Sequence, residues 1–316
     1  SNNVSESCTK CDSEYSFKGI NLGTHKGTFT QLIEPAGFSI DLYSTPTRAI
    51  SEKTKPQYLE PLLLNIDPWS PNQNSYLDFR TNELEEEAKI LFYNTGNGSG
   101  YSLCFDCGRI ETSNELLEGH KRLRGGKNNE GENLCSAKNI VDHIILGSTF
   151  VTDFTEIRIK NKNGTFINDK KVAYSLAVIF TKSLAEYLAI EESELGFGIK
   201  KYKGYTTIFI YDTAKGGAGY ASKFNLYTKY ILDQALDVLV NCDCQSACTK
   251  CLIDRYTQWH IEDLDRLIAI DWLRHSVKNK LPNELLESEH DITPMFGTLF
   301  DEIKRLNYHY GIKEID

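Results

Sequence analysis

A cluster of four cysteines constrains the fold of this chain more than any other feature of its sequence. The spacing is C-x-C-x3-C-x2-C, and the members are Cys242, Cys244, Cys248 and Cys251. Four thiolates this close in sequence can wrap one ion in the closed, tetrahedral geometry of a structural zinc site. An iron–sulfur cluster uses the same four-cysteine ligation and is the alternative. The pattern therefore predicts a metal-stabilised reversal of the chain, and we favour zinc.

A second group of potential ligands lies in the first half of the chain, with the spacing C-x2-C-x12-H-x14-C. Its members are Cys104, Cys107, His120 and Cys135. Three sulfurs and one imidazole nitrogen form a common structural zinc set, so the predicted cofactor is two zinc ions. Two alternatives stay open. In one, His120 is an exposed member of a basic run. In the other, the knuckle formed by Cys104 and Cys107 shares a metal site with Cys8 and Cys11 and leaves Cys135 free. Both predicted sites lack a vacant position for catalytic water, so neither indicates metal-dependent hydrolysis.

The composition limits the classes of protein to which this chain can belong. Nine cysteines in 316 residues are an odd number, and the N-terminus shows no charged and then apolar signal pattern. Metal ligands in a reducing compartment are therefore expected rather than disulfides, and the expected location is cytoplasmic. No apolar run approaches the roughly 20 residues of a membrane span, so no membrane partner is expected. A net charge of −9 argues against sequence-independent DNA binding driven by the overall charge of the protein.

A short basic segment is the main exception to this acidic character. Four cations lie within the segment 120–127 beside a glycine pair: Lys121, Arg122, Arg124 and Lys127. Clustered cations bind phosphate groups, so the segment is a candidate nucleic-acid contact. An ordinary charged surface loop is the alternative. A second, looser basic stretch contains Arg158, Lys160, Lys162, Lys170 and Lys171.

Residues 1–143 have the pattern of a β-rich region with zinc knuckles. Short extended segments between turn residues predict strands over 37–43, 76–80, 88–93 and 101–104. The glycine-rich segment 94–100 predicts a hairpin turn between the last two strands. The sequence contains no G-x-x-x-x-G-K-[ST] phosphate loop.

From residue 144 onward, helical periodicity alternates with strand-like segments. Residues 144–316 are therefore predicted to form an α/β zinc-binding domain with a helical tail, and the fold class of the chain is α+β. The predicted strands cover 152–160, 194–200 and 206–211, and a turn is predicted over 164–168. The predicted helices cover 172–189, 220–240, 261–278 and 296–307.

The segment between the last of these strands and the next helix has an unusual glycine pattern. It reads Y-D-T-A-K-G-G-A-G-Y, and the residues of interest are Asp212, Gly216, Gly217, Gly219 and Tyr220. Glycines permit tight turning of the backbone, and exposed amides at a helix start can receive an anion. A purely structural strand–turn–helix connection is the alternative.

The order of the glycine loop, a helix, the four cysteines and a later H-x3-L-D-R segment closely resembles a known family. It resembles the MrfA-type zinc-binding domain at the C-terminal end of superfamily 2 DEAD/DEAH-type helicases. The resemblance covers about residues 145–275, and its further matched residues are Thr152, Asp153, His260, Leu264, Asp265 and Arg266. His260 lies one residue further from the Leu-Asp-Arg than in the family pattern. The resemblance implies zinc on the four cysteines and a helicase motor nearby.

The resemblance also implies a biological setting. Family members occur in DNA-repair helicases and in bacterial anti-phage systems, including the DISARM component DrmB, which pairs with the helicase DrmA. This chain has no Walker A motif and no DEAD/DEAH box, so it is more similar to a DrmB-type partner, or to a C-terminal fragment of one, than to a motor. Helicase activity is expected in a partner or in a segment outside this sequence. We expect a non-catalytic, zinc-stabilised accessory module of a DNA helicase. The expected contacts with DNA or the motor are Lys121, Arg122, Arg124, Lys127, Asp212, Gly216, Gly217, Gly219, Tyr220, His260 and Arg266.

Two other functions stay open. A metal-dependent nuclease would need Asp153, Asp212, His260 and Asp265 to converge on a divalent ion, and a magnesium-dependent cleavage assay on DNA would reveal it. A zinc scaffold with no nucleic-acid role would capture no helicase and would be insensitive to salt.

Overall fold

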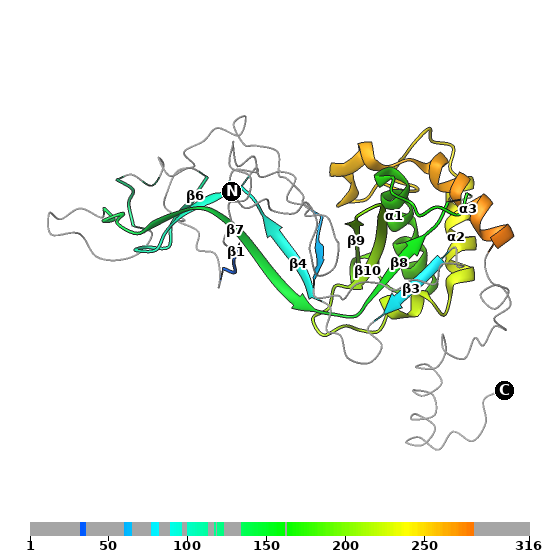
Figure 1. Cartoon of the computed structure of the whole chain (residues 1–316), viewed down its shortest axis with the longest axis horizontal. Helices are drawn as coiled ribbons and strands as arrows, with labels where there is room; N and C mark the ends of the chain where they lie inside the picture. The colour runs from blue at the N-terminus through cyan, green and yellow to red at the C-terminus, as the bar shows by residue number, and fades with distance from the viewer. Residues whose placement is uncertain are drawn as a thin grey trace, which may run out of the picture.

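The structure is a computed structural model that contains two β-sheets, and one long strand of the first sheet leads into the second (Figure 1). It describes residues 32–35, 60–64, 77–81, 89–96, 100–112, 117, 119–122, 134–161 and 163–280, without the side chains of 275–280. The predicted α+β class is confirmed. The predicted strand 37–43 and helix 296–307 lie outside the described residues, as do Cys8, Cys11, Arg124, Lys127 and Lys162.

The first sheet is built around one long strand, β7. Its strand order is β2-β4-β7-β5-β6, and β1 pairs in parallel with β7. The bounds are β1 Leu32–Ile33, β2 Leu62–Leu64, β4 Lys89–Asn94, β5 Tyr101–Cys104, β6 Ile110–Glu111 and β7 Ile140–Val151. The predicted strands 88–93 and 101–104 are therefore confirmed as β4 and β5.

The hairpin predicted between β4 and β5 is wrong. Both strands pair antiparallel with β7, β4 along its second half and β5 along its first part, and not with each other. The turn chemistry is nevertheless real, because the Asn94 side chain accepts hydrogen bonds from the Gly96 amide and the Tyr101 hydroxyl. The long β7 supplies a pairing edge for both strands, which a local turn pattern cannot reveal.

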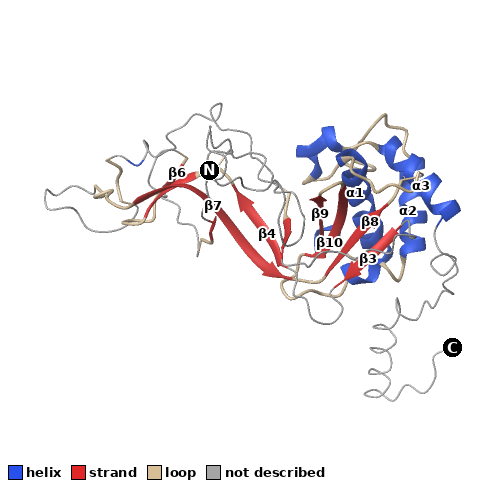
Figure 2. Cartoon of the chain, in the orientation of Figure 1, coloured by secondary structure: helices blue, strands red, loops and turns tan. Residues whose placement is uncertain are grey.

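The second sheet is antiparallel and carries helices on one face (Figure 2). Its order is β3-β8-β10-β9, with β3 Leu77–Thr81, β8 Phe154–Ile159, β9 Leu195–Tyr202 and β10 Tyr205–Asp212. The helices are α1 Lys170–Tyr187, α2 Thr228–Val240 and α3 Arg266–Lys280, with short 3₁₀ helices η3 Glu192–Glu194, η4 Ala221–Phe224 and η5 Thr257–Asp263. None of the helices in this described part is long and apolar enough to cross a membrane.

Helix α1 lies at the centre of this half of the molecule. The Asp169 side chain caps it by accepting hydrogen bonds from the amides of Lys171 and Val172. Its residues 173–181 are all buried, because the sheet covers one side of the helix and α2 and α3 cover another. Leu176, Ile179 and Phe180 are fully buried in the main hydrophobic core. The helix predicted over 172–189 is confirmed.

Strand β8 is buried on both faces, although its sequence alternates like a half-exposed strand. The Glu156 carboxylate is fully buried and accepts hydrogen bonds from the Tyr202 hydroxyl at 2.8 Å and the Thr207 hydroxyl at 2.6 Å. Strand β3 adds the charge partner, since Arg80 Nη2 lies 2.6 Å from Glu156 Oε2. A buried carboxylate requires such partners, because desolvation of an unpaired charge costs several kcal/mol.

Strand β3 thus joins the second sheet from the first half of the sequence, and β7 runs through residue 143. The division into 1–143 and 144–316 stays a prediction. Arg158 of the looser basic stretch is also buried and pairs with Asp78 of β3. That stretch therefore supplies internal charges to the sheet as well as surface ones.

Two predicted helices begin later than the sequence indicates. The predicted helix 220–240 is divided into η4 and α2, and Thr228 at the start of α2 donates its hydroxyl to the carbonyls of Phe224 and Asn225. The predicted helix 261–278 begins at Arg266, because the Asp265 side chain accepts the amides of Leu267 and Ile268 as an N-cap.

Candidate functional site

The four C-terminal cysteines converge on one point. Cys242 Sγ lies 3.5 Å from Cys244 Sγ and 3.4 Å from Cys248 Sγ. Cys251 Sγ lies 3.6 Å from Cys244 Sγ and 3.8 Å from Cys248 Sγ. Four sulfurs placed about 2.3 Å from one zinc ion in a tetrahedron lie about 3.8 Å apart. The donor set and its spacing therefore fit one tetrahedral zinc ion.

The protein around this cluster fixes its position between α2 and α3. Helix α2 ends at Val240, two residues before Cys242, and Cys242 and Cys251 are both buried against the main core. The Arg266 guanidinium donates to the Cys244 carbonyl at 2.6 Å and to the Leu239 carbonyl at 2.8 Å. Arg266 thus braces the cysteine loop from the first residue of α3.

The thiols of this cluster differ in acidity when no metal is bound. The Lys250 amide and the neighbouring thiols lower the pKa of Cys248 to about 7. Burial and hydrogen bonds to the other cysteines raise the pKa of Cys244 to about 12. Because a metal ion binds thiolates, it must displace protons from this cluster, and its affinity falls as the pH falls.

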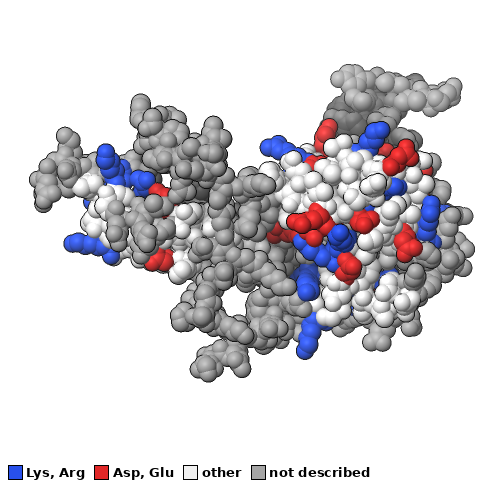
Figure 3. Space-filling view, turned by 90° about the horizontal axis from the view of Figure 1, so that it is seen from above, with Lys and Arg blue, Asp and Glu red and all other residues white. Residues whose placement is uncertain are grey.

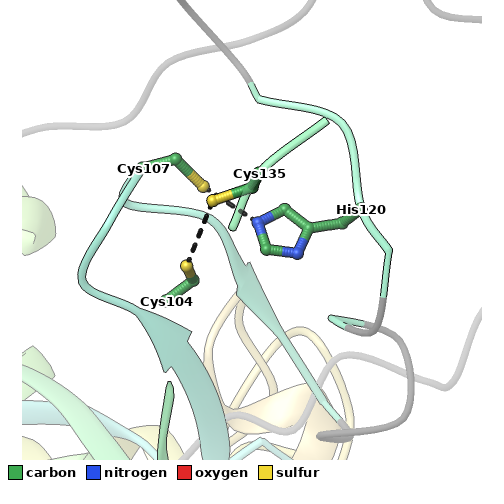
Figure 4. Close-up of side chains that lie close together, drawn as sticks. All are labelled: Cys104, Cys107, His120 and Cys135. Carbon is green, nitrogen blue, oxygen red and sulfur yellow. Dashed lines mark hydrogen bonds between the residues drawn. The ribbon is translucent and has the colours of Figure 1, made fainter. Parts of the chain in front are cut away.

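The cysteines and histidine of the first half also converge, at the end of the first sheet (Figure 4). Cys104 Sγ lies 3.7 Å from Cys135 Sγ, and Cys107 Sγ lies 3.0 Å from His120 Nε2. One ligand atom from each of the four residues lies within 4.8 Å of the others. His120 is only 6% exposed, so it is not an exposed member of the basic run.

The basic segment follows His120 of this second cluster directly in the sequence. Lys121 is exposed and Arg122 is half-buried, while Arg124 and Lys127 lie outside the described residues. Lys and Arg side chains lie at this end of the molecule, and on the helical half they are interspersed with Asp and Glu (Figure 3). The described surface in this view thus mixes both signs of charge.

The glycine loop after β10 is held by carboxylates of the protein itself. Asp212 is fully buried and accepts hydrogen bonds from the amides of Ala218 at 2.6 Å, Tyr220 at 3.1 Å and Ala221 at 2.7 Å. Asp153 accepts the Gly219 amide at 2.9 Å. These amides already have an anionic acceptor, so the loop has the contacts of a structural turn rather than of an open anion site.

Backbone conformation explains the glycines of this loop, and close packing adds to it at Gly217. Gly216, Gly217 and Gly219 all have positive φ angles, which side chains rarely adopt. A Cβ atom on Gly217 would also collide with the Asp153 carboxylate. The loop is therefore held against Asp153, the residue just before β8.

The four residues of the nuclease alternative do not form one acidic site. Asp212 and Asp153 bind loop amides, and Asp265 caps α3. His260 packs on the Tyr174 ring at 5.5 Å, with its Nδ1 3.7 Å from Asp263. Among the described residues, no potential metal-binding group combines members of this set.

Sequence patterns missed one charged cluster that includes His260. Lys170 Nζ lies 2.6 Å from Asp263 and 3.2 Å from Glu60, and Glu60, His260 and Asp263 lie close together. Its members come from three distant segments, so no local spacing signals it. The lysine ammonium already pairs with both carboxylates, which indicates an ion-pair network rather than a metal site.

Comparisons with known proteins agree with the zinc chemistry. Residues 176–252 match the model of the MrfA Zn-binding domain family, and this range includes all four C-terminal cysteines. A curated relative, Druantia protein DruE of Escherichia coli strain UMEA 4076-1, is 28% identical over an alignment of 212 residues that covers 60% of this chain. The chain spans 11% of the length of that relative.

Two solved structures of the DUF1998 helicase MrfA are distant matches. The DNA-bound structure covers 64% of this chain with a TM-score of 0.35 and 15% identity, and the chain covers 25% of it. The structure with DNA and AMPPNP covers 38% of this chain with a TM-score of 0.25 and 12% identity, and the chain covers 24% of it. Both scores lie below 0.5, so they establish no common fold.

The resemblance to the MrfA-type zinc-binding domain is therefore confirmed by the family model. Both cysteine clusters are compatible with zinc. The assignment of individual ligands, the number of ions, and the residues that contact DNA or a motor stay predictions.

Proposed function

We propose that this chain is a non-catalytic, zinc-stabilised accessory module of a DNA helicase, acting in the cytoplasm in anti-phage defence or DNA repair. Its partner would be a superfamily 2 helicase, of which a DrmA-like protein is one specific form. The family match at residues 176–252 and the likeness to a Druantia protein support this proposal. In the proposed module Cys242, Cys244, Cys248 and Cys251 bind a structural zinc ion.

The closed donor set of the C-terminal cluster carries the proposal. Four sulfur atoms at tetrahedral spacing fill the coordination of one zinc ion and leave no position for a water molecule or substrate. Arg266 and the burial of Cys242 and Cys251 hold this set against the hydrophobic core. Such a centre supports a scaffold, since a catalytic zinc ion needs an open position.

The state of the carboxylates also supports a scaffold over a nuclease. Asp212 is fully buried, and its two carboxylate oxygens accept hydrogen bonds from three backbone amides. A catalytic carboxylate must instead face a metal ion or substrate. Magnesium-dependent cleavage of single-stranded or duplex DNA that is abolished by Asp212→Asn, in a variant that still folds, would overturn the proposal.

DNA contact in this module would come from the basic segment beside the second cluster. The exposed Lys121 and its neighbour Arg122 are its described members. Neutralising Lys121, Arg122, Arg124 and Lys127 together should weaken DNA binding and reduce the slope of log affinity against log salt by about 0.9 for each phosphate that is no longer neutralised. Fluorescence anisotropy of labelled DNA over a salt series measures both, and Lys201→Ala, an exposed lysine on β9, is the matched control.

Partnership with a motor is tested by binding to the purified superfamily 2 helicase motor encoded in the same operon or polypeptide. We expect a complex on size-exclusion chromatography and a change in DNA-stimulated ATP hydrolysis when the chain is added. A chain that loads zinc and folds but neither binds the motor nor alters its ATP hydrolysis would support the zinc-scaffold alternative instead.

A further inference from the structure

We propose that Cys104, Cys107, His120 and Cys135 bind a second zinc ion through three sulfurs and one nitrogen, independently of the four-cysteine centre. This site lies outside residues 176–252, the range matched by the zinc-binding family model. The proposal rests on the geometry of the first sheet and not on the proposed function.

The ligand atoms lie close enough to surround one ion. Two sulfurs on one zinc ion lie about 3.8 Å apart, and a sulfur and a nitrogen about 3.5 Å apart. Cys104 Sγ and Cys135 Sγ lie 3.7 Å apart, which matches the first value. Cys107 Sγ and His120 Nε2 lie 3.0 Å apart, at hydrogen-bond distance, and would move apart by about 0.5 Å to bind the ion. All four side chains point toward one another in Figure 4.

The histidine is oriented as a zinc ligand would be. His120 Nδ1 hydrogen-bonds the Leu117 carbonyl, an acceptor, so Nδ1 must carry the proton. The lone pair is then on Nε2, the atom that faces Cys107 Sγ. Metal-bound histidines typically donate their second ring nitrogen to a carbonyl or carboxylate in this way.

The backbone around the knuckle is already shaped for this ligand set. The Gly108 amide donates to the Cys104 carbonyl at 2.8 Å, which closes the turn between the first two ligands. The Asp106 side chain accepts from the Ser136 hydroxyl, the Lys138 amide and the Asn139 side chain, at 2.7–2.9 Å. Asp106 therefore ties the knuckle to the segment that carries Cys135.

The apolar core at this end of the sheet is small among the residues that the structure describes. Its hydrophobic cluster consists of Cys104, Leu117 and Cys135, with Cys107 and Ile140 packed against it. Three of these five residues are proposed ligands, so the apolar contribution without metal is small. A metal ion at their centre supplies the stabilisation that a core this small lacks.

The proposed ion also closes the basic segment into a loop. His120 and Cys135 bracket residues 121–134, and the Cys135 amide donates to the His120 carbonyl at 2.9 Å. Lys121 pairs with Leu134 in a β-bridge just inside these ligands. Zinc at this site would therefore fix both ends of the segment that carries Lys121, Arg122, Arg124 and Lys127.

The test is the number of zinc ions per purified chain, measured by elemental analysis on a set of variants. We expect two ions in the wild-type chain, and one in Cys135→Ser and in His120→Ala. The exposed histidine of β7 provides the matched control, and His143→Asn should keep two ions. The double variant Cys8→Ser, Cys11→Ser should also keep two, because those cysteines are not part of this site.

Cobalt substitution identifies the donors at the second site. In Cys248→Ser, which retains only this site, the Co²⁺ spectrum should be that of a tetrahedral three-sulfur, one-nitrogen centre. His120→Cys should retain the ion and shift the spectrum to that of a four-sulfur centre. The single ion kept by Cys135→Ser also reports that the rest of the chain is folded.

Two results would overturn the proposal. One is a single zinc ion in the wild-type chain that Cys248→Ser removes, which would leave the four-cysteine centre intact as the only site. The other is loss of one ion in the Cys8 and Cys11 double variant, which would assign the knuckle to those cysteines. By contrast, two ions that both survive Cys248→Ser would contradict the four-cysteine centre of the proposed function.

Discussion

The two cysteine clusters have nearly the same donors but very different surroundings. The C-terminal cluster lies against a large core in which Leu252, Leu264 and Leu273 are almost fully buried. Among the described residues, the cluster of the first sheet packs with Leu117 and the partly buried Ile140. The C-terminal cluster therefore holds a loop against a large hydrophobic core. In the first sheet, by contrast, the cysteines themselves make up most of the local cluster of buried residues that the structure describes.

This difference predicts unequal dependence on metal. Structural zinc contributes on the order of 10 kcal/mol to small modules that fold around it. A region with its own apolar core needs less of that contribution, because burial of apolar surface already stabilises it. The end of the first sheet should therefore be the more sensitive of the two regions to loss of its ion.

Removing metal with a chelator should unfold the end of the first sheet and leave the second sheet folded. Amide exchange should become fast in β5 and β6 and stay slow in β8 and β10, as measured by mass spectrometry. The physical reason is the small apolar cluster around Leu117. Equal loss of protection in both sheets would remove the contrast between the clusters.

Cys248→Ser should release the C-terminal ion and lower the free energy of unfolding by about 4–5 kcal/mol, as expected when a structural metal is lost. The helices should remain, because α1 and the sheet keep their own core. Urea denaturation followed by circular dichroism measures this change. Thr249→Ser, an exposed position in the same loop, is the control and should change little.

Arg266→Ala should cost about 2–3 kcal/mol, because the variant lacks a buried guanidinium that donates to two loop carbonyls. Zinc content should stay the same while the ion is lost to a competing chelator more readily. Arg266→Lys should recover part of the stability. Arg274→Ala, at an exposed position on the same helix, is expected to be neutral.

The smallest expected effect is the order in which the thiols react. With metal removed, Cys248 should be alkylated at least about tenfold faster than Cys244 at pH 7–8, because its pKa is lowered to about 7 while that of Cys244 is raised to about 12. Peptide mass spectrometry measures the order. Lowering the pH through 7 should slow alkylation of Cys248 as its thiolate is protonated. Bound zinc should protect both thiols.

Local patterns in the sequence predicted most of the second half. Helical spacing indicated the position of α1, and strand-like segments indicated β9 and β10, because these elements bury sequence-local apolar faces. The cysteine and histidine spacing likewise indicated the two groups of four side chains that the structure brings together, Cys104, Cys107, His120 and Cys135, and Cys242, Cys244, Cys248 and Cys251. Short-range chemistry of this kind is visible without knowledge of the fold.

Long-range pairing explains what the sequence could not predict. The hairpin between β4 and β5 was wrong because both strands pair with β7, which lies more than thirty residues further on. The charge partners of Glu156 and Arg158 are on β3, far upstream. Arg266 was expected at a contact surface, but its guanidinium faces the cysteine loop, and only the packing of α3 against α2 reveals this.

The direct passage from β7 into β8 has a mechanical consequence. A strand of 12 residues spans about 40 Å, and only Thr152 and Asp153 separate it from β8. Thr152 donates its hydroxyl to the Asp212 carbonyl at 2.6 Å, and the Gly216 amide donates to the Val151 carbonyl at 2.8 Å. Any displacement of the strand at its Val151 end would therefore also displace the glycine loop, because Val151 and Thr152 are hydrogen-bonded to the residues at its start.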